Sequence, residues 1–234
     1  MKCLSGKTAL VTDVACEMGR AGALALAKAG AQVLVHYGGA DQEADAVVAE
    51  IRALGAHAQK VAADLRTPEG PYRLARRVRV VIGARLDVLV VNASITKNAS
   101  IEETSVEAFD ALFSLNVRAP YFLVQQLMPT MCKGSSIVMV SARAAMDNAS
   151  AYAATQGAIN TLVTHFASTL GPRGVRVNGI SPGEVTPHSS DFATMEIARM
   201  PGSAGLGNAL VFLASDAARW ITGDTLHIGG GSTF

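Results

Sequence analysis

The sequence is poor in cysteine, in aromatic residues and in net charge. Its three cysteines, Cys3, Cys16 and Cys132, are far apart and odd in number, which fits neither a disulfide framework nor paired metal-ligand spacing. Lys and Arg number 20 against 19 acidic residues, so the net charge of +1 provides no field for holding nucleic acid or anionic lipid. We therefore expect a cytoplasmic protein without a metal site or a nucleic-acid partner.

Long apolar runs are also missing. No stretch approaches the roughly 20 apolar residues that a membrane helix needs, and the first residues lack the pattern of a signal peptide. We therefore expect no membrane partner. Half of the residues are nevertheless hydrophobic and only 17% are charged, a composition that favours a globular chain with a buried, two-sided parallel sheet.

Short β-branched runs alternate with longer stretches of helical periodicity along the chain. A strand over residues 8–12, a helix over 19–29 and a strand over 32–36 form the first βαβ unit. Further strands are predicted over residues 57–62, 88–92, 137–141, 176–181 and 225–228. The pattern predicts an α/β fold with one Rossmann-type, doubly wound parallel sheet and helices on both faces.

No composition shift or repeat marks a domain boundary, so we expect residues 1–234 to form a single domain. The least patterned stretch covers residues 183–203, which are rich in Pro, Ser, Thr and Met. A long loop that follows the carboxyl end of a strand in such a sheet is where a ligand would be covered.

The turn after the first predicted strand is unusual for a phosphate-binding loop. A strand that leads through a loop into a helix leaves backbone N–H groups pointing at any bound phosphate, and such a turn needs glycines. Residues 12–19 retain only Gly19 of the three expected glycines, and carboxylates stand at Asp13 and Glu17. Both side chains are expected to obstruct a dinucleotide, although acids near a helix N-terminus also have a purely structural explanation.

Eight segments in a fixed order carry a resemblance to a known family. They are residues 7–12, the Gly19 turn, 64–65, 92–93, 114–117, 152–155, 177–178 with 182–183, and 212–215 with 221–223. In this order and spacing, the chain resembles the short-chain dehydrogenase/reductase family. The resemblance implies a sheet of about seven strands and a dinucleotide site at Thr12, Gly19, Asp64, Asn92, Pro182 and Gly183.

The family uses a tetrad of Asn, Ser, Tyr and Lys, of which half is present. The resemblance places the Asn at Asn116 and the Tyr at Tyr152, whereas Ala142 and Gln156 occupy the Ser and Lys positions. Gln156 lies four residues after Tyr152 on the same helical face but carries no charge to stabilise a phenolate. Ser141 is an alternative for the missing Ser, but neighbouring residues of a strand face opposite sides of the sheet.

The second predicted strand gives little support for either dinucleotide. It ends at Val35, His36, Tyr37 and Gly38 without the acidic residue that would bind the ribose hydroxyls of NAD, so NADP is favoured if any cofactor binds. No Arg precedes Glu17 or follows the strand to hold the extra phosphate. His36 is expected to be a surface residue at the strand end, and no tightly bound cofactor is expected.

Three functions compete on these residues. The first is a catalytically degenerate family member, a pseudo-oxidoreductase that serves as a binding or partner module. The second is an NADPH-dependent carbonyl or 3-oxoacyl reductase that tolerates the replacements. The third is cofactor-independent acid/base chemistry by Tyr152 and Asn116 with Asp147 or His188. Because the losses cluster at ligand-facing positions, the sequence favours the first function and leaves enzyme activity uncertain.

The family resemblance also implies a homo-oligomer, a tetramer or a dimer. Family members associate through two long helices, which fall here over residues 106–131 and 151–170. The second helix carries a stripe of small and apolar residues that would allow close approach across a twofold axis.

Overall fold

The computed structural model describes residues 2–39, 41–83, 85–96, 99–141, 149–182 and 203–228, and its strands form one parallel sheet. The seven strands are ordered β3-β2-β1-β4-β5-β6-β7. Their bounds are β1 Thr8–Val11, β2 Gln32–Tyr37, β3 Ala58–Ala62, β4 Val88–Val91, β5 Ser136–Val140, β6 Arg176–Pro182 and β7 Thr225–Ile228. The predicted α/β Rossmann-type fold is confirmed, and each predicted strand is found within one residue of its expected ends.

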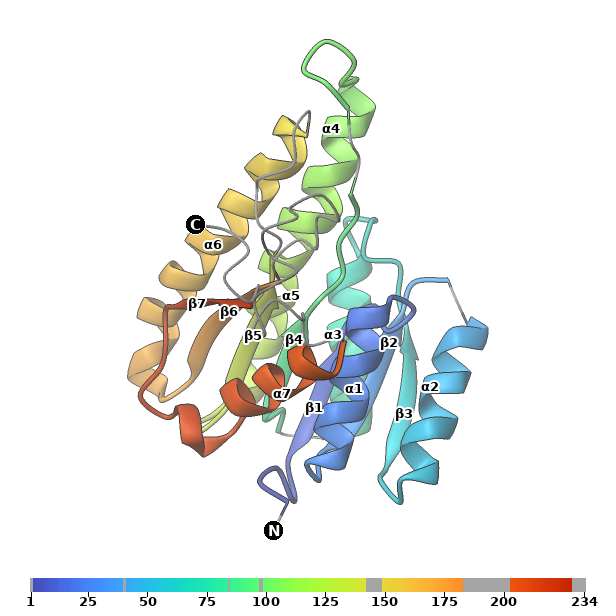
Figure 1. Cartoon of the computed structure of the whole chain (residues 1–234), viewed down its shortest axis with the longest axis vertical. Coiled ribbons are helices and arrows are strands. Elements are labelled where there is room, and N and C mark those ends of the chain that lie inside the picture. The colour runs from blue at the N-terminus through green and yellow to red at the C-terminus, as the bar shows by residue number, and fades with distance from the viewer. Residues whose placement is uncertain are drawn as a thin grey trace, which may run out of the picture.

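Helices cover both faces of this sheet. They are α1 Glu17–Lys28, α2 Asp41–Ala53, α3 Gly70–Ile82, α4 Val106–Phe113, α5 Ala119–Leu127, α6 Ser150–Leu170 and α7 Ser203–Ala214. One core contains residues of α1, α2 and α7, and the other contains residues of α3, α5 and α6. In Figure 1, α1 and α7 lie in front of the strands, and α3 and α5 lie behind them.

Alternate side chains along each strand enter the two cores on opposite faces of the sheet. In β4, Leu89 and Val91 belong to the core under α3 and α5, whereas Val88 and Val90 belong to the core under α1 and α7. Successive side chains of a strand point to opposite faces, so a strand buried on both faces is apolar throughout. This explains the uninterrupted VLVV sequence of β4.

The strand order reverses between β1 and β4, since β2 lies on one side of β1 and β4 on the other. In open parallel sheets, ligands bind outside the carboxyl ends of the strands at such a reversal. A ligand site is therefore expected at the segments that follow β1 and β4. Among the described residues, no helix combines the length and apolar composition that a membrane crossing requires.

Candidate functional site

The ends of β1 and β4 are joined by the Thr12 side chain. Its Oγ1 accepts hydrogen bonds from the backbone N–H groups of Asn92, at 2.8 Å, and Ala93, at 3.0 Å. Thr12 is fully buried, so this hydroxyl satisfies two donors that would otherwise be unpaired at the end of the sheet. Two predicted site residues, Thr12 and Asn92, are thus in direct contact.

Asp13 forms the turn that a glycine would form in the family loop. Its φ is 55°, a left-handed conformation that Asp tolerates better than most residues. The backbone is held on both sides, because its N–H donates to His36 Nδ1 at 3.1 Å and its carbonyl accepts from Asn92 Nδ2 at 3.0 Å. Burial raises the pKa of the Asp13 carboxyl above its usual value.

Helix α1 begins at Glu17 because Cys16 caps it. The Cys16 Sγ accepts from the Gly19 N–H at 3.4 Å and from Asn92 Nδ2 at 3.1 Å, and it donates to the Asp13 carbonyl at 3.3 Å. A Cβ at Gly19 would lie 2.1 Å from the Asp13 carbonyl oxygen, so this position requires glycine. Glu17 is exposed in the first helical turn, where the helix dipole favours an acid.

His36 is not the surface residue that the sequence suggested, since it is 2% exposed. Its Nε2 lies 2.9 Å from the Ala63 carbonyl, and its Nδ1 faces the Asp13 N–H. Burial lowers the pKa of the imidazole to about 4, against partial compensation by the Ala63 carbonyl and the Asp64 carboxylate. The prediction failed because both partners follow other strands, far from position 36 in the sequence, and leave no local signal.

A pocket of about 280 Å³ opens over these strand ends. It is lined by Asp13, His36, Gly38, Gly39, Asp64, Leu65, Arg66, Ala93, Ser94, Ile95 and Leu115. The Arg66 guanidinium binds both Asp64 carboxylate oxygens, at 2.9 and 3.0 Å, and lowers the pKa of that carboxyl. Sequence reasoning found Asp64 but missed Arg66, the one cation among the residues that line this pocket.

Asn116 lies in a π-helical turn, Ser114–Arg118, between α4 and α5. Such turns are rare and concentrate at functional sites. The buried side chain accepts from the Ile95 N–H and donates to the Ile95 carbonyl, both at 2.9 Å. It also donates to Thr155 Oγ1 at 3.1 Å. The side chain therefore connects the segment after β4 with helix α6.

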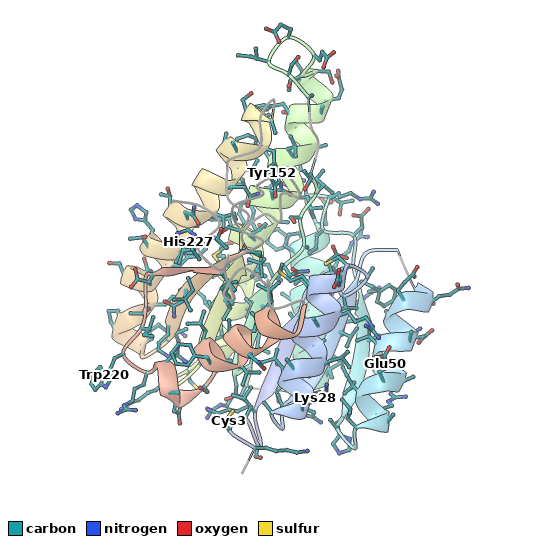
Figure 2. All side chains as sticks on the ribbon, in the orientation of Figure 1. Cys3, Lys28, Glu50, Tyr152, Trp220 and His227 are labelled. Carbon is teal, nitrogen blue, oxygen red and sulfur yellow. The ribbon has the colours of Figure 1, made fainter. Side chains whose placement is uncertain are left out.

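Tyr152 and Gln156 are buried on the first turns of α6, 4% and 3% exposed. Tyr152 packs with Leu112 and Ala149, with Ile95 beside them, and Figure 2 shows it between α4 and α6. Gln156 donates to Thr155 Oγ1 at 3.2 Å, and that hydroxyl donates to the Tyr152 carbonyl at 2.7 Å. Thr155 was not singled out in the sequence, although it follows Tyr152 within the same motif.

The pocket and the predicted catalytic residues share one neighbour. Ile95 lines the pocket, packs beside Tyr152 and binds Asn116 through its backbone. The structure therefore brings together the predicted cofactor residues Thr12, Gly19, Asp64 and Asn92 and the predicted catalytic residues Asn116 and Tyr152 at one edge of the sheet.

The structure gives fewer contacts for the remaining predicted residues, and several of them lie outside the described ranges. Ser141 donates to Asn160 Oδ1 of α6 at 3.2 Å, and Pro182 is the last residue of β6. Ala142, Asp147, Gly183 and His188 lie outside the described residues. Within the described ranges, no group of three or more His, Cys, Asp or Glu side chains is arranged to hold a metal ion.

The similarity to known proteins extends over nearly the whole chain. A family model described as Enoyl-(Acyl carrier protein) reductase matches residues 14–233. An uncharacterized oxidoreductase from Methylorubrum extorquens is 36% identical and covers 99% of both chains. An L-rhamnose 1-dehydrogenase (NAD(P)(+)) from Sphingomonas sp. is 32% identical over 99% of this chain and 98% of its own. The crystal structure of the angucycline C-6 ketoreductase LanV with bound NADP is 34% identical, with a TM-score of 0.87 over 98% of this chain and 96% of that chain.

These findings correct the functional prediction. The sequence favoured a pseudo-oxidoreductase acting as a binding module, but full-length relatives of 32% to 36% identity are named oxidoreductases, and one similar structure holds NADP. The losses at Ala142 and Gln156 were given too much weight, because such losses do not by themselves show which residues perform the reaction. The chain belongs to the short-chain dehydrogenase/reductase family.

Proposed function

We propose that this protein is an NADP(H)-dependent oxidoreductase that interconverts a carbonyl group and an alcohol. The single observation that carries the proposal is the hydrogen-bonded group of Asn116, Thr155 and Gln156 under Tyr152, next to the pocket at the ends of β1 and β4. The named activities of full-length relatives and the NADP bound to LanV support the same reaction class.

The residues present fit a dinucleotide in two respects. The Gly19 position has no room for a Cβ, so the backbone of the first turn stays close-packed as a phosphate loop requires. The pocket beside it offers the Asp64 carboxylate and the Arg66 guanidinium to the adenosine half. Thr12, Gly19, Asn92, Asp64 and Arg66 would hold the cofactor, and NADPH, when bound, supplies the hydride.

Tyr152 donates the proton to the carbonyl oxygen in this proposal. An unassisted tyrosine titrates near pH 10 and is a poor acid or base near neutral pH. Gln156 occupies the position of the family's Lys and supplies N–H donors without a positive charge. We therefore expect a slower enzyme than a member with the full tetrad, rather than an inactive one.

Two carboxylates near the pocket reduce cofactor affinity in the same proposal. Glu17 stands in the first turn of α1, where a phosphate would lie, and Asp13 belongs to the loop beneath it. Like charges close to one another repel, although the exposure of Glu17 allows water and salt to screen the repulsion between its carboxylate and a phosphate. NADP(H) binding is thus expected to be weak.

Association and location belong to the same proposal. We infer a homo-oligomer that associates through α4, α5 and α6, where Phe109 and Tyr121 are each 42% exposed. Arg118 and Val117 border a groove of about 580 Å³ beside Tyr121. All three cysteines are free and exposed, which suits a reducing cytoplasm.

The test is NADPH oxidation with a panel of 3-oxoacyl thioesters and simple ketones, compared with Tyr152→Phe. The variant should lose at least about 10²-fold in kcat, because it lacks the acid. Tyr72→Phe, an exposed tyrosine on α3, is the control and should retain full activity. No turnover by the unaltered protein, or equal turnover by Tyr152→Phe, would overturn the proposal.

A further inference from the structure

His36 connects the ends of three strands at the base of the pocket. It belongs to β2, it contacts the Asp13 N–H after β1, and it contacts the Ala63 carbonyl after β3. A backbone N–H can only donate, so Nδ1 is the acceptor and the proton is on Nε2, which donates to Ala63. A neutral imidazole in a single tautomer satisfies both contacts.

The contact with Asp13 is the unusual one, because Asp13 is the only non-glycine residue among those described whose φ is positive. A glycine adopts this conformation without strain, whereas other L-residues do so only when their surroundings hold them there. His36 and Asn92 hold the N–H and the carbonyl of Asp13, one on each side. The carbonyl held in this way also accepts from Cys16, the cap of α1.

Burial keeps the His36 ring neutral, because it lowers the pKa of the imidazole more than the nearby Asp64 carboxylate raises it. Asp13 and Asp64 line the same pocket, and Arg66 is bound to Asp64. A protonated ring could no longer accept from Asp13, so the contact exists only while the ring is neutral.

We propose that His36 is a positioning residue for the cofactor: by fixing the left-handed turn at Asp13, it replaces the missing glycine of the phosphate loop. The inference rests on the proposed function, because the fixed turn matters for activity only if a dinucleotide binds there. His36 acts through the backbone of Asp13 and is not assigned any contact with the reacting atoms.

The first experiment measures the Kd of NADPH by calorimetry for two variants. His36→Leu removes both contacts and should weaken binding about fivefold or more, since the partly buried N–H of Asp13 loses its acceptor in the loop. His36→Asn places an oxygen near the position of Nδ1 and should recover most of the affinity. His57→Leu, at the far end of the sheet before β3, is the matched control and should bind as the unaltered protein does.

A second pair of proteins, in which Asp13 is already replaced by glycine, separates a positioning role of His36 from a general effect on stability. In Asp13→Gly the turn needs no external support, so adding His36→Leu should change the Kd by less than about twofold. The KM for NADPH should follow the Kd in each variant, while kcat at saturating NADPH stays unchanged. If His36→Leu lowers the Tm but leaves the Kd of NADPH unaltered in both backgrounds, the residue is merely structural and the proposal fails.

A measurement without cofactor distinguishes this proposal from the proposed function. The Asp13 amide should exchange its hydrogen slowly in the unaltered protein and about tenfold faster in His36→Leu. Equal exchange in the two proteins would overturn the role of His36, whatever NADPH does. If exchange is faster in His36→Leu but the unaltered protein binds no NADPH, His36 still holds the Asp13 turn. The proposed NADP(H)-dependent function and the proposed role of His36 in cofactor binding would then both be refuted.

Discussion

Asn116 Nδ2 donates a hydrogen bond of 3.1 Å to Thr155 Oγ1, which joins the π-helical turn to α6. Thr155 also accepts from Gln156 and donates to the Tyr152 carbonyl, and its side chain is fully buried. One hydroxyl thus connects three residues of the proposed active site. Because its lone pairs and proton are all used within a buried network, its removal leaves donors without an acceptor.

Thr155→Val tests this network, since valine keeps the shape of threonine but loses the hydroxyl. We expect a loss of about 1–3 kcal/mol in the free energy of unfolding, measured by urea denaturation, because the amides of Asn116 and Gln156 lose an acceptor. kcat should fall as well. Thr155→Ser keeps the oxygen and should lose less than half as much stability. Equal losses of unfolding free energy in Thr155→Val and Thr155→Ser would mean that packing, and not the hydroxyl, causes the effect.

Gln156→Lys tests whether charge is what the site lacks. The new ammonium lies one helical turn from Tyr152, and a nearby positive charge favours a phenolate. We expect kcat for alcohol oxidation to rise, and the pH at which it reaches half of its maximum to fall by about one unit or more. Gln125→Lys on α5 adds the same charge at an exposed position and should leave the pH profile unchanged. A profile unmoved by Gln156→Lys would contradict the role given to this position.

Glu17→Gln separates charge from bulk in the first turn of α1. If the carboxylate repels the cofactor phosphates, this variant should tighten NADPH binding about tenfold at low salt, and the gain should shrink as salt is added. Glu43→Gln removes an exposed acid from the first turn of α2 and serves as the control. Glu17→Gly shows the added effect of bulk. Identical Kd values for all of these proteins would mean that Glu17 points away from the bound cofactor.

The fold was predictable because it depends on local periodicity. Leu89 and Val90 lie next to each other in sequence but enter opposite cores, as an uninterrupted apolar strand requires. The helix start was placed two residues late, at Gly19 instead of Glu17. Its cap is Cys16, a residue type that is not among the preferred helix caps, so no rule based on residue type would have located it.

The site was less predictable because its contacts join distant parts of the chain. His36 is held by Asp13 and Ala63, and neither contact leaves a mark in the residues around position 36. The expectation that Asp13 spoils the turn overlooked the fact that backbone partners can hold an aspartate in a left-handed conformation. The family resemblance located Asn116 and Tyr152, but it assigned no role to Thr155, the last residue of the 152–155 segment.

Exposed aromatic residues on α4 and α5 lead to a prediction about assembly. Phe109 stacks on Phe113 with ring centroids 4.5 Å apart, and Tyr121 contacts Phe166 of α6, yet Phe109 and Tyr121 remain 42% exposed. A second copy packed on these helices would bury them. Sedimentation at micromolar concentration should show a dimer or tetramer, and Tyr121→Asp should shift it toward monomer. Val80→Asp, on exposed α3 surface, is the control, and a purely monomeric unaltered protein would contradict the prediction.

Burial of His36 predicts a loss of stability in mild acid. The pKa of this side chain is about 4 in the folded protein and near 6.5 in an unfolded chain, so the unfolded state binds the proton more readily. The contribution of His36 is therefore fully present above pH 6.5 and is lost progressively as the pH falls toward 4. Between pH 7 and pH 5 the unaltered protein should lose about 2 kcal/mol of unfolding free energy from this residue alone.

The comparison with His36→Asn isolates that loss, because asparagine does not titrate. Urea denaturation at pH 7 and pH 5 should give a difference in unfolding free energy that is smaller by about 2 kcal/mol in the variant. His57→Asn removes an exposed histidine, and this variant should lose stability with falling pH as the unaltered protein does. The same pH dependence in His36→Asn and the unaltered protein would mean that another group is responsible. In that case the imidazole would not be the neutral acceptor that holds Asp13.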